Sequence, residues 1–269
     1  MKVKTIGLVL PSGNIKEEQR EEIYSKIDFL KTKFKVKEFF NRNASFGYLS
    51  DTDENRAKYF ETAFLDDEVD LVVSVRGGYG AIRIVDKINY DLIKDKIYLG
   101  SSDASILLSA LYSKTNVKCF HGLMVSNGFV ENLEENIKII ENNIFNIDLE
   151  PVKKGACKGY LWGGNLSSLV SLFSSEKYLP NEDIILFLED LNEPMYKIDK
   201  MFYEIYRNQK LKSKIRGIIF GDFYFEKDKI IPLIKEYSEI FDVPTYLTFD
   251  ITHKINNKTI PIGKFIELK

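Results

Sequence analysis

The fold of this 269-residue chain is decided by the stretch Ile97-Tyr98-Leu99-Gly100-Ser101-Ser102-Asp103-Ala104-Ser105. A short apolar run ends in Gly-Ser-Ser-Asp, and an apolar segment with helical character follows at once. This layout predicts a strand, a tight turn and a helix. A serine at such a turn projects from the sheet edge, where the new helix directs free backbone N–H groups and its positive dipole end.

The turn has two interpretations. It is a nucleophile elbow, with Ser102 preferred over Ser101 because it directly precedes the helix, or its polar residues only cap that helix. Ser and Asp lead the preferences for the helix N-cap, so the stretch alone favours capping. A nucleophile would need further groups from elsewhere in the chain.

Upstream and downstream of this turn, strands and helices alternate. Apolar runs at 3–10 and 71–75 predict strands, and the β-branched run at 71–75 is typical of a strand buried on both faces. We therefore expect an α/β protein. Its N-terminal domain, residues 1–150, would be a Rossmann-like (flavodoxin-like) parallel sheet, and residues 151–269 would form a smaller mixed α/β domain.

A glycine-rich turn, Arg76-Gly77-Gly78-Tyr79-Gly80, follows the strand expected at 71–75. Glycines between a strand and a helix let the backbone approach a ligand closely, although they also serve tight packing turns. The pattern is not G-x-G-x-x-G and does not end in Gly-Lys-Ser/Thr, so nucleotide binding is weakly supported. Together with the Asp103 N–H, backbone N–H groups of Gly77 or Gly78 could form an oxyanion hole.

Composition excludes several kinds of partner. Lys and Arg number 38 and Asp and Glu 40, giving a net charge of −2 with both signs interspersed. We expect no nucleic-acid or membrane partner. Cys119 and Cys157 form no CxxC motif, so no metal site is expected and free thiols are predicted. No export signal or membrane-spanning run is found, which favours a cytoplasmic location.

Only two histidines, His121 and His253, are available as a general base. His121 follows an expected strand and suits a structural role at its turn, whereas His253 lies in a polar loop beyond a strand and would otherwise be a surface residue. Glu189 ends an apolar strand at 183–190, so we expect it to be half-buried; Asp190 and Glu193 compete for the same role. Serine, carboxylate and histidine would supply nucleophile, orienting acid and base.

Motifs across nearly the whole chain resemble the LD-carboxypeptidase family of serine peptidases, which includes microcin immunity peptidases. The matching stretches lie at 11–13, 47–53, 76–80, 100–103, 121–122, 162–167, 186–196, 250–253 and 260–263, in the family's order.

The resemblance implies a cofactor- and metal-independent peptidase with Ser102 as nucleophile, Glu189 as orienting acid and His253 as base. It assigns the oxyanion hole to Gly78 and Asp103, and we expect Gly77 and Tyr79 at the substrate. Arg76, in the same turn, lies where a guanidinium could grip a substrate carboxylate bidentately. The resemblance further implies a cytoplasmic homodimer that acts on small muropeptide-like substrates. Family members release terminal D-alanine from murein tetrapeptides by cutting an L,D-peptide bond during cell-wall recycling.

The chain departs from the family at two motifs. Ser101 stands where a tyrosine is usual, and Leu123 where proline is common; these changes affect the expected substrate more than the chemistry. Two alternatives therefore stay open. One is an immunity-type peptidase acting on a peptide–nucleotide antibiotic or a related acyl-linked molecule, and the other is a non-catalytic muropeptide-binding protein.

Overall fold

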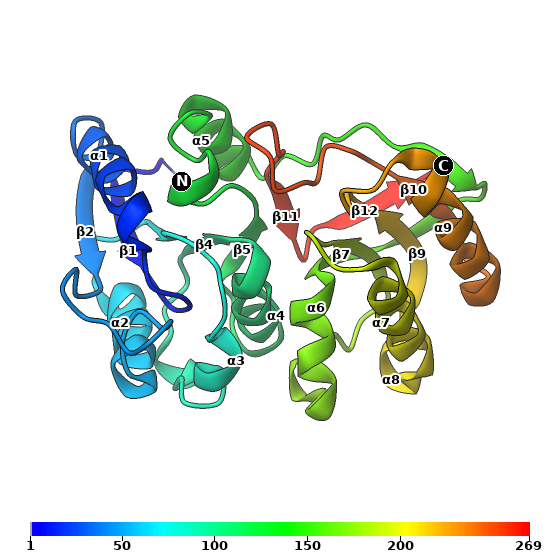
Figure 1. Cartoon of the computed structure of the whole chain (residues 1–269), viewed down its shortest axis with the longest axis horizontal. Helices are drawn as coiled ribbons and strands as arrows, with labels where there is room; N and C mark the ends of the chain where they lie inside the picture. The colour runs from blue at the N-terminus through cyan, green and yellow to red at the C-terminus, as the bar shows by residue number, and fades with distance from the viewer. Residues whose placement is uncertain (1) are drawn as a thin grey trace.

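The computed structural model describes residues 2–269 as two lobes that lie side by side, each built on a six-stranded sheet (Figure 1). Helices pack against both sheets, and the strands are mostly parallel. The predicted α/β fold with two sheet units is confirmed.

The first sheet has the strand order β11-β5-β4-β3-β1-β2, and only β11 runs antiparallel to its neighbour. Its strands are β1 (Thr5–Val9), β2 (Lys35–Phe39), β3 (Leu71–Ser74), β4 (Ile97–Gly100), β5 (Lys118–His121) and β11 (Ile260–Ile262). The helices of this lobe are α1 (Arg20–Lys31), α2 (Asp53–Leu65), α3 (Ala81–Ile84), α4 (Ser105–Lys114) and α5 (Leu133–Asn142).

Alternation of side chains along β3 explains why helices cover both faces of this sheet. Leu71 and Val73 pack in an apolar cluster with buried residues of α1 and α5, whereas Val72 packs on the opposite face with residues of α2 and α4. The side chains of Leu71, Val72 and Val73 are all fully buried. A strand buried on both faces reads as a continuous apolar run, as predicted for 71–75.

The second sheet has the order β12-β7-β8-β9-β10-β6, with antiparallel strands at both edges. Its strands are β6 (Glu150–Lys153), β7 (Cys157–Asn165), β8 (Ile184–Glu189), β9 (Ile215–Phe220), β10 (Thr245–Leu247) and β12 (Phe265–Leu268). Its helices are α6 (Leu166–Val170), α7 (Met195–Arg207), α8 (Gln209–Lys212) and α9 (Lys227–Phe241).

The chain crosses between the lobes more than once. It passes from α5 to β6, and after β10 it returns so that β11 pairs with β5 of the first sheet. It then enters the second sheet again as β12, which pairs with β7. Residues 260–262 therefore belong to the first sheet although they lie near the C-terminus (Figure 1).

One predicted helix start differs from the structure. The spacing of Asn14 and Glu17, three residues apart, predicts a capping box, but the helical segment begins at Glu17 after Lys16, without a side-chain cap. The reason is that Asn14 is held elsewhere: its N–H donates to the Tyr48 carbonyl at 2.9 Å, and Arg76 contacts its carbonyl.

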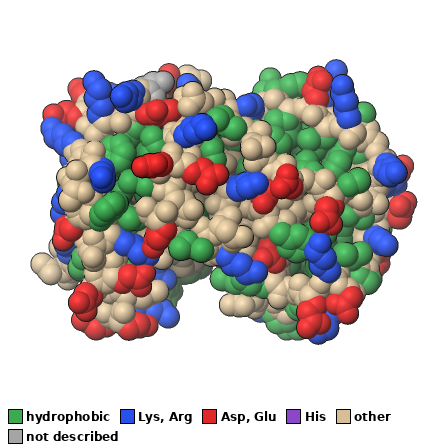
Figure 2. Space-filling model, turned by 90° about the horizontal axis from the view of Figure 1, so that it is seen from above, with side chains coloured by type: hydrophobic (Ala, Val, Ile, Leu, Met, Phe, Trp, Pro, Cys, Tyr) green, Lys and Arg blue, Asp and Glu red, His purple; other side chains and the backbone are tan. Residues whose placement is uncertain are grey.

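The surface carries charges of both signs. Figure 2 shows Lys and Arg side chains interspersed with Asp and Glu side chains over the displayed face. Within residues 2–269, every helix is too short or too polar to cross a bilayer.

Candidate active site

The loops that follow β1 and β3 meet at the point where the strand order of the first sheet reverses. The Gly13 N–H donates to the Gly77 carbonyl at 3.2 Å and so joins the two loops. In open parallel sheets, ligands bind in the crevice at the carboxyl ends of the strands where the order reverses. The topology therefore marks this edge, with the glycine-rich turn, as a ligand site.

Ser102 lies at the same edge, after β4. The strand ends at Gly100, a short 3-10 turn covers Ser102–Ala104, and α4 begins at Ser105, as the predicted strand-turn-helix requires. Ser102 has a φ of 55°, a left-handed conformation that non-glycine residues seldom adopt and that is typical of a nucleophile elbow. Ser101 is buried, whereas Ser102 is partly exposed, so Ser102 is the serine that a substrate can reach.

The glycine-rich turn packs directly against this serine. A Cβ added to Gly77 would lie 2.9 Å from the Ser102 Cβ and 3.0 Å from its Oγ, and 3.6 Å from the Asp103 nitrogen. Gly78 has a φ of +109° and lies against Gly13. Only glycine at position 77 permits this approach, which brings the backbone of the turn beside Ser102 and Asp103.

Two buried charged groups fix the glycine-rich turn. The Asp103 carboxylate accepts a hydrogen bond from the Ala81 N–H at 2.8 Å, just beyond the turn. The buried Arg56 guanidinium, from the first turn of α2, donates to the Gly80 carbonyl at 3.0 Å and also contacts the Pro11 carbonyl. Sequence reasoning missed Arg56, because an arginine within an amphipathic helix gives no local sign of burial.

Glu189 and His253 meet in the second lobe. The Nδ1 atom of His253 lies 2.8 Å from Oε2 of Glu189, at the carboxyl end of β8. The Glu189 side chain is 0% exposed, so the expectation of a half-buried carboxylate was wrong, since the strand end is covered by the other lobe. Burial alone would raise the pKa of Glu189, but His253 and His121 lower it to about 2.

His253 is held in an acidic setting. Its side chain is 12% exposed, and burial alone would lower its pKa. The negative charges of Glu189, Asp190 and Asp222 outweigh burial, and the pKa of His253 is raised above the ordinary value of 6.5. Because Nδ1 faces Glu189, Nε2 is the nitrogen left for a substrate or nucleophile.

The two lobes meet next to these groups. The Asn165 N–H, at the end of β7, donates to Oγ of Ser105 at 3.0 Å, and Asn165 is paired with Glu189 in the sheet. The structure thus brings Glu189 into contact with His253, and Gly77 into contact with Ser102. Among residues 2–269, no side-chain hydrogen bond joins Ser102 to His253.

Comparisons with known proteins agree with this architecture. The LD-carboxypeptidase N-terminal domain matches residues 6–122, and the LD-carboxypeptidase C-terminal domain matches residues 158–268. A probable murein peptide carboxypeptidase of Bacillus subtilis is 30% identical over 81% of this chain and 74% of its own length. The chain belongs to the LD-carboxypeptidase family. Membership indicates a hydrolase of the serine-type carboxypeptidase class.

Two further relatives cover more of the chain. The microcin C7 self-immunity protein MccF of Escherichia coli is 25% identical over 96% of this chain and 88% of its own. The solved structure of muramoyltetrapeptide carboxypeptidase from Oxalobacter formigenes superposes with a TM-score of 0.81 at 20% identity, over 98% of this chain and 94% of that one. The latter likeness concerns the fold alone.

In this LD-carboxypeptidase family member, pockets lie on both sides of the Gly78-Tyr79 segment. One, of about 460 Å³, is lined by Arg76 together with residues of the loop after β1. The Arg76 guanidinium contacts the Asn14 carbonyl; within the described residues no carboxylate forms a salt bridge with it, although the charge of Glu18 acts on it from farther away. The other pocket, of about 220 Å³, lies between the lobes and is lined by Asp103 and serines of α6 and its extension.

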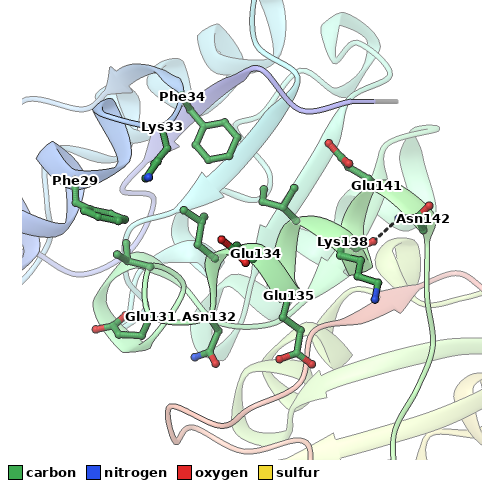
Figure 3. A pocket seen from close by; sticks show the side chains of 13 residues that line it. Phe29, Lys33, Phe34, Glu131, Asn132, Glu134, Glu135, Lys138, Glu141 and Asn142 are labelled. Carbon is green, nitrogen blue, oxygen red and sulfur yellow. Dashed lines mark hydrogen bonds between the residues drawn. The ribbon is translucent and has the colours of Figure 1, made fainter.

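A larger hollow of about 850 Å³ lies away from these groups, between α1 and α5 (Figure 3). Phe29 and Phe34 line it together with charged side chains, including Lys138 of α5 and Glu131 just before that helix. None of the predicted site residues borders this hollow. The volume of a pocket therefore does not by itself indicate where the predicted site residues lie in this fold.

Proposed function

We propose that the chain is a serine carboxypeptidase in which Ser102, Glu189 and His253 act as a catalytic triad. The observation that carries the proposal is the buried Glu189 in contact with Nδ1 of His253, together with Ser102 held at a φ of 55° in the elbow after β4. A carboxylate on Nδ1 fixes the imidazole orientation and leaves Nε2 to accept a proton.

The proposed reaction begins with attack by Ser102 Oγ on the scissile carbonyl carbon, while Nε2 of His253 takes the hydroxyl proton. When the tetrahedral intermediate collapses, the C–N bond breaks and His253 gives this proton to the leaving amine. A water molecule, activated by the same imidazole, then hydrolyses the acyl-enzyme and restores Ser102. Glu189 stabilises the imidazolium in both halves.

The negative charge on the attacked carbonyl oxygen would be stabilised by the N–H groups of Gly78 and Asp103. The approach of Gly77 to Ser102 supports this placement, and Arg56 and Asp103 keep the turn fixed before substrate binds. Arg76, beside Gly77 and Tyr79, would hold a substrate carboxylate, because its guanidinium lacks a salt-bridge partner among the described residues and lines the adjacent pocket.

The proposed reaction is release of terminal D-alanine from a murein tetrapeptide by cleavage of an L,D-peptide bond. It is supported by the likeness to the murein peptide carboxypeptidase of Bacillus subtilis. The proposal includes the remaining family expectations, namely a cytoplasmic homodimer that acts without a cofactor.

Mass spectrometry of D-alanine released from murein tetrapeptide tests the proposal. Wild type should release D-alanine, while Ser102→Ala and His253→Ala should lose activity by about 10⁴-fold or more. A fluorophosphonate should form an adduct on Ser102 of wild type and leave Ser102→Ala unmodified. Release by all three proteins would refute the triad.

A second candidate is an immunity-type peptidase that hydrolyses a peptide–nucleotide antibiotic or a related acyl-linked molecule. The likeness to MccF, which spans 96% of this chain, favours it. If wild type reacts with the fluorophosphonate but does not release D-alanine, this candidate replaces the murein substrate. A folded wild type that does neither would instead favour a muropeptide-binding protein without catalysis.

A further inference from the structure

Both histidines of the chain meet the same carboxylate. His253 Nδ1 lies 2.8 Å from Oε2 of Glu189, and His121 Nε2 lies 3.5 Å from Oε1. The three side chains come from distant parts of the sequence and from both lobes. With only two histidines in 269 residues, this convergence calls for a role for His121.

The His121 ring is held rigidly. It lies at the end of β5, where its backbone pairs with Gly100 on one side and Ile260 on the other. The side chain is 1% exposed and packs edge-on against Phe187 of β8, with ring centroids 5.2 Å apart. In the described part of the chain, neither ring nitrogen has a hydrogen-bond partner, and the Glu189 carboxylate is the acceptor that Nε2 faces, at 3.5 Å.

The Glu189 carboxylate needs a second donor. Each oxygen of a buried, ionised carboxylate costs free energy unless a hydrogen bond replaces its lost water. His253 lies on Oε2, and within residues 2–269 His121 is the group positioned to donate to Oε1. Without that donor the carboxylate gains freedom to turn away from His253.

We propose that His121 is a positioning residue whose Nε2–H donates to Oε1 of Glu189 and thereby keeps Oε2 on Nδ1 of His253. The effect of this hydrogen bond on the reaction rate rests on the function proposed above. The existence of the hydrogen bond does not depend on that function. The separation of 3.5 Å is long for a hydrogen bond, as catalytic contacts often are before substrate binds.

A purely structural role makes a different prediction. If the ring only fills space against Phe187, an apolar side chain of similar size at position 121 should serve as well as a polar one. If Nε2–H donation matters, His121→Gln should substitute for histidine, because the glutamine amide nitrogen can occupy a similar place, whereas His121→Leu should not.

Nitrogen-15 NMR tests the hydrogen bond without any substrate. In a protein made without a histidine tag, signals arise only from His121 and His253, and the His121→Gln spectrum assigns them. At a pH where both rings are neutral, we expect His121 to carry its proton on Nε2 and His253 to carry its proton on Nδ1. A proton on Nδ1 of His121, with Nε2 bare, would overturn the proposal.

The rate of Ser102 modification by the fluorophosphonate tests the consequence. We expect His121→Leu to slow this rate constant by about 10- to 100-fold, and His121→Gln to recover most of it. A pseudo-first-order rate constant does not depend on the amount of active protein, and the melting temperatures must show that both variants are fully folded at the assay temperature. Equal slowing in both variants, or none in His121→Leu, would refute positioning by donation.

The outcomes also separate the two proposals. If wild type is not modified at all, the proposed triad fails, while the NMR result still decides whether His121 donates to Glu189. If wild type is modified normally and the His121 tautomer is wrong, the triad stands and the positioning role is refuted.

Discussion

The two lobes contribute to the candidate site by different physical means. The first lobe supplies backbone geometry: a serine at a φ of 55° and a glycine turn packed against it. The second supplies buried charge, in Glu189 and the histidine beside it. We therefore expect activity to fall when a substitution adds a single carbon atom to the turn of the first lobe. In the second lobe, we expect it to fall when a substitution removes a charge without changing the shape of the side chain.

Removal of the charge in the second lobe should have the largest effect. We expect Glu189→Gln to lower kcat by about 10⁴-fold, because the amide no longer stabilises the imidazolium or fixes its tautomer. Turnover of the substrate proposed above, or the fluorophosphonate rate, measures the loss.

Glu193→Gln is the matched control on the loop after β8. Glu193 is paired with Lys197 at 3.2 Å rather than with a histidine, so its variant should keep near-normal activity. If Glu193→Gln were the more damaging change, Glu193 and not Glu189 would be the orienting acid.

Addition of one carbon in the first lobe should come next. Gly77→Ala places a Cβ 2.9 Å from the Ser102 Cβ, closer than such atoms approach in proteins. We expect the turn to shift from Ser102 and kcat to fall by about 10²- to 10³-fold, as when an oxyanion donor is lost. Activity equal to wild type, with an unchanged melting temperature, would show that the turn does not take part.

The pH dependence is the smallest effect and reports on the second lobe alone. Because acidic neighbours raise the pKa of His253, the acid limb of kcat/KM should lie above pH 6.5. Residual activity of Glu189→Gln should have this limb at lower pH, while Gly77→Ala should leave it in place. A limb in wild type below pH 6.5 would contradict the assignment of His253 as base.

The pairing of His253 with Glu189 also makes the stability of the fold depend on pH, but in the direction opposite to the dependence of activity. Since the pKa of His253 is raised on folding, its contribution is complete below the unfolded value of about 6.5 and is lost as the pH rises through the folded value. Activity and stability should therefore respond to pH in opposite directions near this histidine.

Local sequence was sufficient for the elements that carry the proposed site residues. The apolar run before Ser102 and the polar turn after it specified a strand, turn and helix, and the run before Glu189 specified a strand end. The burial of Glu189 could not be predicted, because residues of the other lobe cover it. The role of His121 stayed open for the same reason, since its partner is 68 positions away.

Which strands pair across long distances in the sequence could not be predicted either. Ile260-Pro261-Ile262 carries no local sign that it joins the first sheet rather than the second, and its partner strand ends at His121. The capping box expected at Asn14 failed because tertiary contacts with Tyr48 and Arg76 took priority over the local preference.

The position of β11 has a consequence for synthesis of the protein. During translation, β5 is complete long before residues 260–262 emerge from the ribosome, so its outer edge stays unpaired while more than half of the chain is made. An open strand edge is a site for wrong pairing and aggregation. The nascent chain is thus vulnerable at this edge beside His121 until β11, the last strand but one, closes it.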